Sequence, residues 1–322
     1  MAIEQLLGDI SRESFLEDYY LKRPLALSGV SQPFAGLGSW DTVAQIAEHP
    51  EADLMIVRQG ERWPGENPPT GEALRRLHDE GYTVLARHAE RQHPGLAQLA
   101  AEFQRDFDGQ VDVHLYCTPG KQFGFGWHYD AEEVFILQTE GTKEYSLRKN
   151  TVNPWPLVET LPADMRYERE IMPFMNCSLS AGDMLYIPGG FWHRAAAQTD
   201  SISLAIGVLP ATGIDLFDFL RARLLESLRW RQRLPAAGDV NPADCETLQG
   251  QYSAAIDELT ADLLRELKRP DLVRAFLDSR SPPPPEAETT AIADCTQPPI
   301  ANATESWPPC RCLNSSSNRS CR

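Results

Sequence analysis

Hydrophobic positions along the chain change their spacing twice, and these changes divide the sequence into regions. Up to residue 110, apolar residues recur mostly at helical intervals, as in SWDTVAQIAEHP, with short apolar strands between helices. Over residues 111–212 they alternate as in β-strands, and over residues 213–280 the helical interval returns. We therefore expect a helical or mixed N-terminal flank, a β-rich core and a C-terminal helical bundle, followed by a tail at 281–322.

The β-rich region is predicted to be a jelly roll. In VDVHLYC, Val111 and Val113 fall on one face and His114 and Tyr116 on the other. EVFILQ and KEYSLR flank TEGT, which has the sequence of a hairpin-like turn around Gly141, and further short strands are separated by Ala-Gly-Asp, Pro-Gly-Gly and Thr-Asp-Ser. Short strands at this spacing are typical of a sandwich or barrel of the jelly-roll kind.

Two segments outside these strands have compositions of their own. The connection over 150–176 is long and rich in proline, and we expect it to form a lid or a side loop. The tail over 281–322 is rich in Pro, Ser, Asn and Thr, which predicts disorder. Its cysteines, in CRCLNSSSNRSC, leave a metal or disulfide clip as the alternative.

Charge and hydropathy narrow the classes of partner. The 322 residues include 30 lysines and arginines against 46 aspartates and glutamates, a net charge of −16. So acidic a chain is not expected to bind nucleic acid, and it suits a basic partner, although solubility alone also explains the charge. No apolar run approaches the roughly 20 residues that span a bilayer, and the N-terminus does not resemble a secretory signal. The expected location is cytoplasmic, with no membrane contact.

The stretch FGFGWHYD and the later stretch GDMLYIPGGFWHRA together suggest a metal site. His128 and Asp130 are two residues apart, so in a strand they point to the same face. His193 follows a Pro-Gly-Gly turn in the same β-rich region and supplies a third ligand. Two histidines and one carboxylate that leave open positions are the arrangement of non-haem Fe(II) oxygenases. The alternative is that both histidines are hydrogen-bonded structural residues.

Lys143 suggests what else the site binds. It has the strand parity of Tyr145 and Leu147, so its side chain is expected on the buried face, where an unpaired ammonium is costly. A dicarboxylate cosubstrate such as 2-oxoglutarate would pair with Lys143 at one end, with the Tyr116 phenol beside it, and chelate iron at the other. The alternative is that the lysine extends to solvent.

The motifs HYDAEEVFILQTEGTKEYSL and SLSAGDMLYIPGGFWHRA resemble those of the Jumonji-C (JmjC) family of Fe(II)- and 2-oxoglutarate-dependent oxygenases. Within it, LYCTPG and FLEDYYLKRPLAL are similar to segments of the cupin-like ribosomal oxygenases. The resemblance covers residues 10–275 and is specific over 111–209. It implies a mostly β protein whose core, residues 111–212, is a double-stranded β-helix (jelly roll or cupin), with residues 1–110 as a flank of that core.

The resemblance also assigns roles to residues. It implies that His128, Asp130 and His193 bind iron and that Lys143 and Tyr116 bind 2-oxoglutarate. His114 takes a cavity-facing position where relatives often have Asn; we group it with the cosubstrate-binding residues, its role being open.

The activity implied is a dioxygenase reaction with O2. A substrate C–H bond, in a protein or peptide side chain, is hydroxylated, and succinate and CO2 are released; demethylation of an N-methyl group is the other outcome. Residues 213–280 match the family's dimerisation region in position, which implies a homodimer through these helices; the alternative is that they pack on the barrel. The chain departs from relatives at Phe125, where several have Thr, and shows no winged-helix module.

Two other functions remain open on the sequence. One is a metal-dependent cupin enzyme that acts on a small molecule without 2-oxoglutarate, which would have no need of Lys143. The other is a non-catalytic cupin scaffold, which would have no need of all three metal ligands.

Overall fold

The computed structural model describes residues 2–65, 70–162, 165, 175–235 and 245–280. The tail expected at 281–322, and most of the second half of the connection expected to be a lid or side loop, lie outside these residues.

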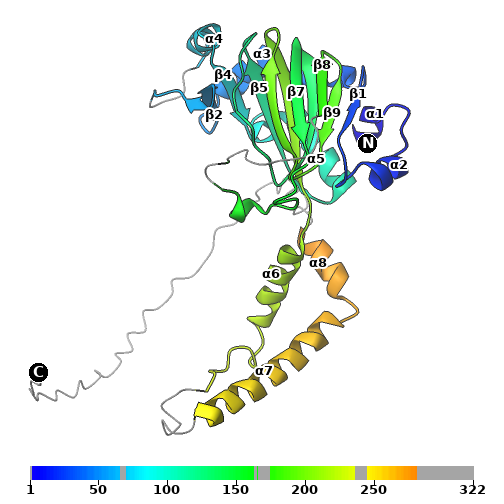
Figure 1. Ribbon diagram of the computed structural model, residues 1–322, viewed down its shortest axis with the longest axis vertical. Helices are drawn as coiled ribbons and strands as arrows, with labels where there is room; N and C mark the ends of the chain where they lie inside the picture. Colours follow the sequence, from blue (N-terminus) through cyan, green and yellow to red (C-terminus); the bar gives the residue numbers. More distant parts are fainter. Residues whose placement is uncertain (1, 66–69, 163–164, 166–174, 236–244, 281–322) are drawn as a thin grey trace, which may run out of the picture. The chain divides into compact units, whose positions relative to one another are not determined.

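Two antiparallel sheets form the body of the molecule (Figure 1). The larger has eight strands in the order β1-β9-β6-β11-β5-β4-β2-β3, and the smaller has three in the order β10-β7-β8. The strands are β1 (Leu25–Leu27), β2 (Asp53–Arg58), β3 (Glu61–Arg62), β4 (Thr83–Arg87), β5 (Gln110–Thr118), β6 (Glu133–Glu140), β7 (Thr142–Arg148), β8 (Met175–Ser180), β9 (Met184–Ile187), β10 (Trp192–Ala197) and β11 (Ser201–Leu209). The predicted fold class, mostly β with a jelly-roll core and flanking helices, is confirmed.

Helices precede and follow the β-rich region, as the helical spacing predicts. They are α1 (Ala2–Leu6), α2 (Arg12–Asp18), α3 (Trp40–Ala47), α4 (Glu72–Asp79), α5 (Pro94–Phe107), α6 (Gly213–Leu224), α7 (Cys245–Leu267) and α8 (Leu272–Arg280), with 3-10 turns at Gln32–Leu37, Ala89–Arg91 and Val158–Thr160. Ser11 caps α2, its hydroxyl accepting a hydrogen bond from the Ser14 N–H. Among the described residues, no helix has the length and apolarity needed to cross a membrane.

Strand β6 has a continuous apolar sequence because both of its faces are buried. Phe135 and Leu137 pack into the large core that the N-terminal helices share with the eight-stranded sheet. Val134 and Ile136 point the other way, into a second core between the two sheets, where they meet residues of β7 such as Leu147. Strand β6 therefore lies between the two cores, and the candidate site lies beside its first residues.

The connection at Gly141 differs from the predicted hairpin. Strands β6 and β7 are consecutive, yet they do not pair: β6 lies between β9 and β11 in one sheet, and β7 lies between β10 and β8 in the other. Gly141 therefore turns the chain from one sheet to the other. It has φ +67°, and a Cβ there would lie 1.9 Å from the Asp200 carbonyl oxygen. A glycine is needed at this crossing for both its conformation and its lack of a side chain.

Candidate metal centre

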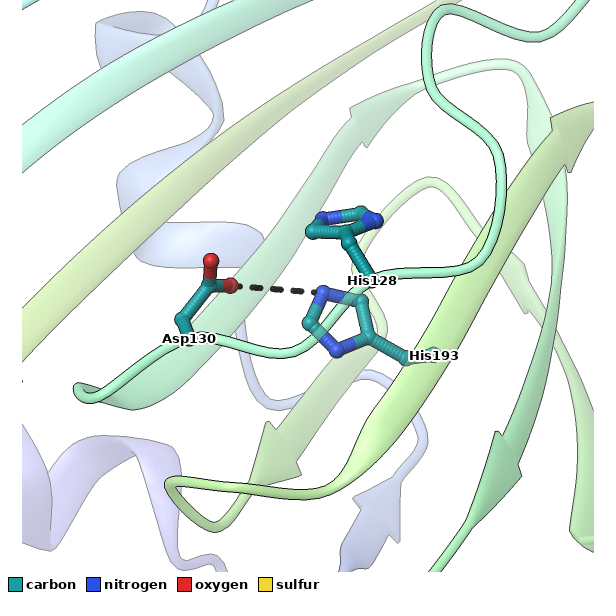
Figure 2. Close-up of side chains that lie close together, drawn as sticks. All are labelled: His128, Asp130 and His193. Carbon is teal, nitrogen blue, oxygen red and sulfur yellow. Dashed lines mark ion pairs between the residues drawn. The ribbon is translucent and has the colours of Figure 1, made fainter. Parts of the chain in front are cut away.

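His128 and His193 are held opposite each other by their own backbones. They form an isolated antiparallel bridge in which the His128 N–H donates to the His193 carbonyl oxygen at 3.0 Å and the His193 N–H donates to the His128 carbonyl oxygen at 2.7 Å. The prediction that His128 and Asp130 lie on one strand is wrong, because the chain makes a single bridge at His128 and Asp130 follows in a loop before β6. The three side chains nevertheless meet on one side (Figure 2).

The Pro-Gly-Gly turn before His193 holds the loop that carries Asp130. The Gly190 N–H donates to the Asp130 carbonyl oxygen at 2.7 Å. Gly190 has φ +80°, a conformation that favours glycine, and Gly189 leaves no room for a Cβ, which would lie 2.9 Å from the Ala131 carbonyl oxygen. The turn therefore packs closely on the segment between His128 and β6.

Each imidazole has one nitrogen bonded to the backbone and one directed to the cluster. The Nδ1 of His128 lies 2.9 Å from the Gly126 carbonyl oxygen, and the Nδ1 of His193 lies 3.0 Å from that of Phe191. A carbonyl only accepts, so both Nδ1 atoms carry the proton and both Nε2 atoms keep a lone pair. The His193 Nε2 lies 3.4 Å from Asp130 Oδ2, as the dashed line in Figure 2 marks.

The cluster fits a divalent metal ion. One ligand atom from each of His128, Asp130 and His193 lies within 4.8 Å of the others. Burial lowers the pKa of His193 to about 4, so this imidazole is neutral at pH 7, the form that binds metals. Two imidazole nitrogens and one carboxylate oxygen suit iron, with coordination positions left open.

A cavity extends from these residues between the two sheets. The three cluster residues line it together with Thr83, Tyr116, Thr118, Gly124, Phe125, Val134, Ile136, Lys143, Tyr145, Ala195, Ser203 and Ala205. The metal ligands, the predicted lysine and the predicted phenol therefore share one space, which is apolar along β6 and polar around Lys143.

Lys143 is a buried ammonium beside the cavity without an anionic partner among the described residues. It is 5% exposed, and its Nζ lies 3.3 Å from Thr118 Oγ1 and 5.3 Å from the centre of the Tyr116 ring. Burial lowers the pKa of Lys143 to about 8. Its expected place on the inward face of β7 is confirmed, with Tyr145 and Leu147 buried on the same face. A carboxylate that entered the cavity would supply the missing partner.

His114 does not line this cavity. It shares the face of Tyr116 on β5, but it lies two residues further from the cavity, and its Nδ1 accepts a hydrogen bond from the His88 N–H at 3.3 Å. Beside it, His88, Glu90 and Asp112 form a second cluster of metal-ligand types. The members of this cluster already form hydrogen bonds within the protein. His88 Nδ1 lies 3.0 Å from Asp112 Oδ1, and Glu90 accepts the Val113 N–H at 2.8 Å. The cavity geometry thus gives no support to a cosubstrate role for His114.

Three hydroxyl residues of the cavity were not foreseen from the sequence. Thr118 has the parity of Tyr116 on β5, and Ser203 is the register partner of Tyr116 on β11, so pairing would have identified both. Thr83 comes from β4 in the N-terminal flank, and its buried Oγ1 has no hydrogen-bond partner among the residues that the structure describes. Its sequence context contains no signal for a site.

Comparison with known protein families gives a match over the central part of the chain. Residues 88–216 match the JmjC domain. The chain is 34% identical over 183 residues to the Dictyostelium discoideum protein named bifunctional lysine-specific demethylase and histidyl-hydroxylase NO66. This alignment covers 52% of the present chain and 35% of that protein. The chain is 24% identical over 319 residues to ribosomal oxygenase 1 of Gallus gallus, covering 93% of this chain and 52% of that protein. The chain spans about half or less of the length of these relatives.

Solved structures show the same fold. The ribosomal oxygenase YcfD from Escherichia coli, in complex with cobalt and 2-oxoglutarate, superposes with a TM-score of 0.60 at 21% identity, over 84% of this chain and 71% of that one. Its complex with cobalt and succinic acid gives a TM-score of 0.56. At this identity the likeness establishes the architecture alone.

Proposed function

Residues 88–216 match the JmjC domain, and from this premise we propose that the chain is an Fe(II)- and 2-oxoglutarate-dependent oxygenase that hydroxylates a side chain of a polypeptide. The observation that carries the proposal is one cavity that contains both an open set of metal ligands and a buried lysine with no anionic partner in the described part of the chain. A metal site alone fits many cupin enzymes. The added ammonium fits a cosubstrate that brings a second carboxylate.

His128, Asp130 and His193 would hold the iron, each through one atom. The backbone bonds of the two Nδ1 atoms fix the tautomers in advance, so the ligands need no proton rearrangement when metal binds. Bound Fe(II) and 2-oxoglutarate supply oxidation by O2, in which the cosubstrate becomes succinate and CO2 and a substrate C–H bond becomes C–OH.

Lys143 would bind the carboxylate of 2-oxoglutarate that is remote from the metal. Thr118, whose hydroxyl is already within hydrogen-bond distance of Nζ, keeps the ammonium oriented toward the cavity. Tyr116 lies beside it and can donate its phenol proton to the same carboxylate. The apolar side chains of Val134 and Ile136 line the same cavity and exclude water from the space between the two ends.

A groove next to the cavity suits a polypeptide substrate. It shares Phe125 and Ala195 with the cavity. Its other lining residues are Phe123, Gly126, Trp127, Glu144, Ser146, Arg194 and Ala196. A chain lying in this groove can present one side chain at the shared residues. The relatives named ribosomal oxygenase and histidyl-hydroxylase make a protein substrate the natural choice, and the net charge of −16 favours one with basic residues.

The C-terminal helices support a homodimer. Large apolar side chains on α6–α8 and just after α6 are exposed in the single chain: Ile214, Phe217, Leu225, Leu228, Ile256, Leu264, Val273 and Leu277. A second copy that covers them would remove this apolar surface from water. Phe217→Asp combined with Ile256→Asp should convert the dimer to monomer in sedimentation equilibrium, whereas Val152→Asp, at a position 83% exposed, should leave it intact. A wild-type chain that sediments as a monomer would contradict the dimer.

The activity is tested by spectroscopy followed by turnover. Fe(II) and 2-oxoglutarate added without O2 should give a weak visible charge-transfer band, and admission of O2 should then give succinate. Basic peptides added with O2 should gain the mass of one oxygen; loss of a methyl group would indicate demethylation instead. Metal binding with neither the band nor succinate would favour the small-molecule cupin enzyme, and absence of metal binding would favour the scaffold.

A further inference from the structure

Glu133 is a buried carboxylate that the proposed chemistry does not use. It is the first residue of β6 and is 3% exposed. It has the parity of Phe135 and Leu137, so it points to the helix-covered side of the sheet, away from the cavity. Burying a carboxylate is unfavourable unless its oxygens accept hydrogen bonds, and its partners therefore indicate what it does.

Both oxygens of Glu133 have partners from distant parts of the chain. Oε1 accepts the Gly189 N–H at 2.9 Å, and Oε2 accepts the Tyr186 O–H. The Tyr186 oxygen in turn accepts the Leu21 N–H at 2.9 Å, and the ring of Tyr186 packs edge-on against Phe15 of α2. A single hydrogen-bonded chain thus joins the N-terminal flank, strand β9 and the turn after β9.

That turn is the one that holds the metal ligands. Gly189 bonds to Glu133, and the next residue, Gly190, donates to the Asp130 carbonyl oxygen. Three residues later the chain reaches His193. Glu133 itself begins the strand that follows the Asp130 loop. Its carboxylate therefore ties together the two segments that carry Asp130 and His193, from the opposite side of the sheet.

We propose that Glu133 is a positioning residue for the metal centre, and that through Tyr186 it makes the N-terminal flank part of the support of that centre. The inference rests on the proposed metal site. Residues 15–21 lie well before residue 88, where the JmjC match begins, so the matched domain lacks one end of this support. Loss of the hydrogen bonds should loosen the turn and widen the spread of distances between Asp130 and His193.

Asp183 offers a matched control at the opposite end of β9. It also ties the N-terminal flank to a turn, since its Oδ1 accepts the Gly29 N–H at 3.0 Å and its Oδ2 accepts the Ser180 N–H at 2.8 Å. The turn it supports, at Gly182, contributes no ligand to the cluster. Asp183→Asn therefore loosens the same flank without touching the turn at Gly189.

The experiment is a titration of the metal-free full chain with Co²⁺, which reports both the dissociation constant and the visible ligand-field spectrum. Glu133→Gln should weaken Co²⁺ binding by about tenfold to a hundredfold and change the spectrum, because groups that orient metal ligands have effects of this size. Tyr186→Phe, which keeps the ring and removes the O–H, should do so by a smaller factor. Asp183→Asn should lower the melting temperature and leave the Co²⁺ dissociation constant within about twofold of the wild type.

The outcomes separate this inference from the proposed function. Equal Co²⁺ affinity and spectrum in folded Tyr186→Phe and the wild type would overturn the inference, as would an Asp183→Asn chain that loses as much affinity. Should Glu133→Gln fail to fold, Tyr186→Phe carries the test. A wild type that binds Co²⁺ but never consumes 2-oxoglutarate would overturn the proposed oxygenase and leave the role of Glu133 standing.

Discussion

His128 and His193, 65 positions apart in sequence, exchange both of their backbone hydrogen bonds across an isolated bridge. Their ring centres lie 4.2 Å apart, and each ring is turned by a bond from Nδ1 to the carbonyl two residues before it. The two histidines therefore have the same local arrangement, a bond from Nδ1 to a nearby backbone carbonyl, on two chain segments that face each other. These backbone bonds set the orientation of the two rings, and one ligand atom from each histidine lies within 4.8 Å of the other and of an Asp130 oxygen.

Removal of any proposed ligand should abolish metal binding without unfolding the chain. We expect His128→Ala, Asp130→Ala and His193→Ala each to lose turnover and to weaken Co²⁺ binding by more than about a hundredfold, since two remaining ligands hold a divalent ion poorly. The core clusters do not include these side chains, so the melting temperature of the metal-free protein should change little. His49→Ala, at an exposed histidine, is the control for the loss of an imidazole. Full succinate production by any of the three would remove that residue from the ligand set.

The buried charge of Lys143 should be necessary for binding of 2-oxoglutarate, and it should lower the free energy of unfolding of the cosubstrate-free protein. Lys143→Met keeps a long apolar side chain and removes the charge, so it should raise the KM for 2-oxoglutarate by about tenfold to a hundredfold, the effect of a lost charge-assisted hydrogen bond. Tyr116→Phe should have a milder effect of the same kind. An unchanged KM in Lys143→Met would place the remote carboxylate elsewhere.

The same substitution should stabilise the cosubstrate-free protein at pH 7. The folded-state pKa of Lys143 is lowered by burial from 10.5 to about 8, so the folded state binds fewer protons than the unfolded state between these values. The free energy of unfolding therefore rises with pH across that window, and below pH 8 the whole cost of the buried charge is present. At about 1.4 kcal/mol per pKa unit, Lys143→Met should gain up to about 3 kcal/mol at pH 7.

Denaturant unfolding at pH 7 and near pH 10 tests the sign of this effect. The gain from Lys143→Met should shrink at the higher pH, where the wild-type lysine is already neutral when folded. The facing groups of Tyr116, Tyr145 and Cys117 have pKa values raised by burial, so they stay neutral and do not obscure the change. A gain that is equal at both pH values would mean that it comes from packing and not from charge.

Gly141→Ala should destabilise the fold at the crossing between the two sheets. A left-handed residue other than glycine costs about 1 kcal/mol, and here the added Cβ also meets the Asp200 carbonyl oxygen. Gly29→Ala separates the two causes, because Gly29 has φ +76° and nothing within 4 Å of its Cβ position. The loss in free energy of unfolding should be clearly larger at Gly141. Equal losses would mean that the segment at Asp200 moves aside freely.

The local part of the site could be predicted from sequence, and the non-local part could not. Alternation along KEYSLR suffices to place Lys143 and Tyr145 on one buried face, because strand parity is a property of the strand itself. The turn at Gly141 has the same residues whether it closes a hairpin or crosses between sheets, so its sequence could not exclude the wrong pairing. Thr83 reaches the cavity only because β4 pairs with β5, a contact set by the whole sheet.

The position of Asp130 is a second case in which local sequence does not reveal the contacts that hold a residue in place. The sequence predicts that the side chains of His128 and Asp130 lie on the same side, and they do. The predicted cause, a shared strand, is wrong, because Asp130 lies in a loop. What holds them is the bond from Gly190 to the Asp130 carbonyl oxygen, together with the bridge at His128. Both depend on a turn some 60 positions later in the chain, which no local pattern around His128 reveals.

Turnover of a polypeptide substrate should depend on salt if acidity guides the encounter. The chain carries a net charge of −16, of which −15 lies on residues 1–280, and attraction between exposed charges weakens as the Debye length falls from about 30 Å at 0.01 M salt to about 10 Å at 0.1 M. The KM for a basic peptide should therefore rise severalfold over this range. A peptide with the same target residue but glutamines in place of its lysines and arginines should start with a higher KM and respond little to salt. Binding of 2-oxoglutarate to the buried Lys143 should also change little, since buried pairs are weakly screened. If salt does not change peptide turnover, the electrostatic part of the proposal is wrong. If oxygen is incorporated only into small molecules in a mixed extract, the substrate is not a polypeptide.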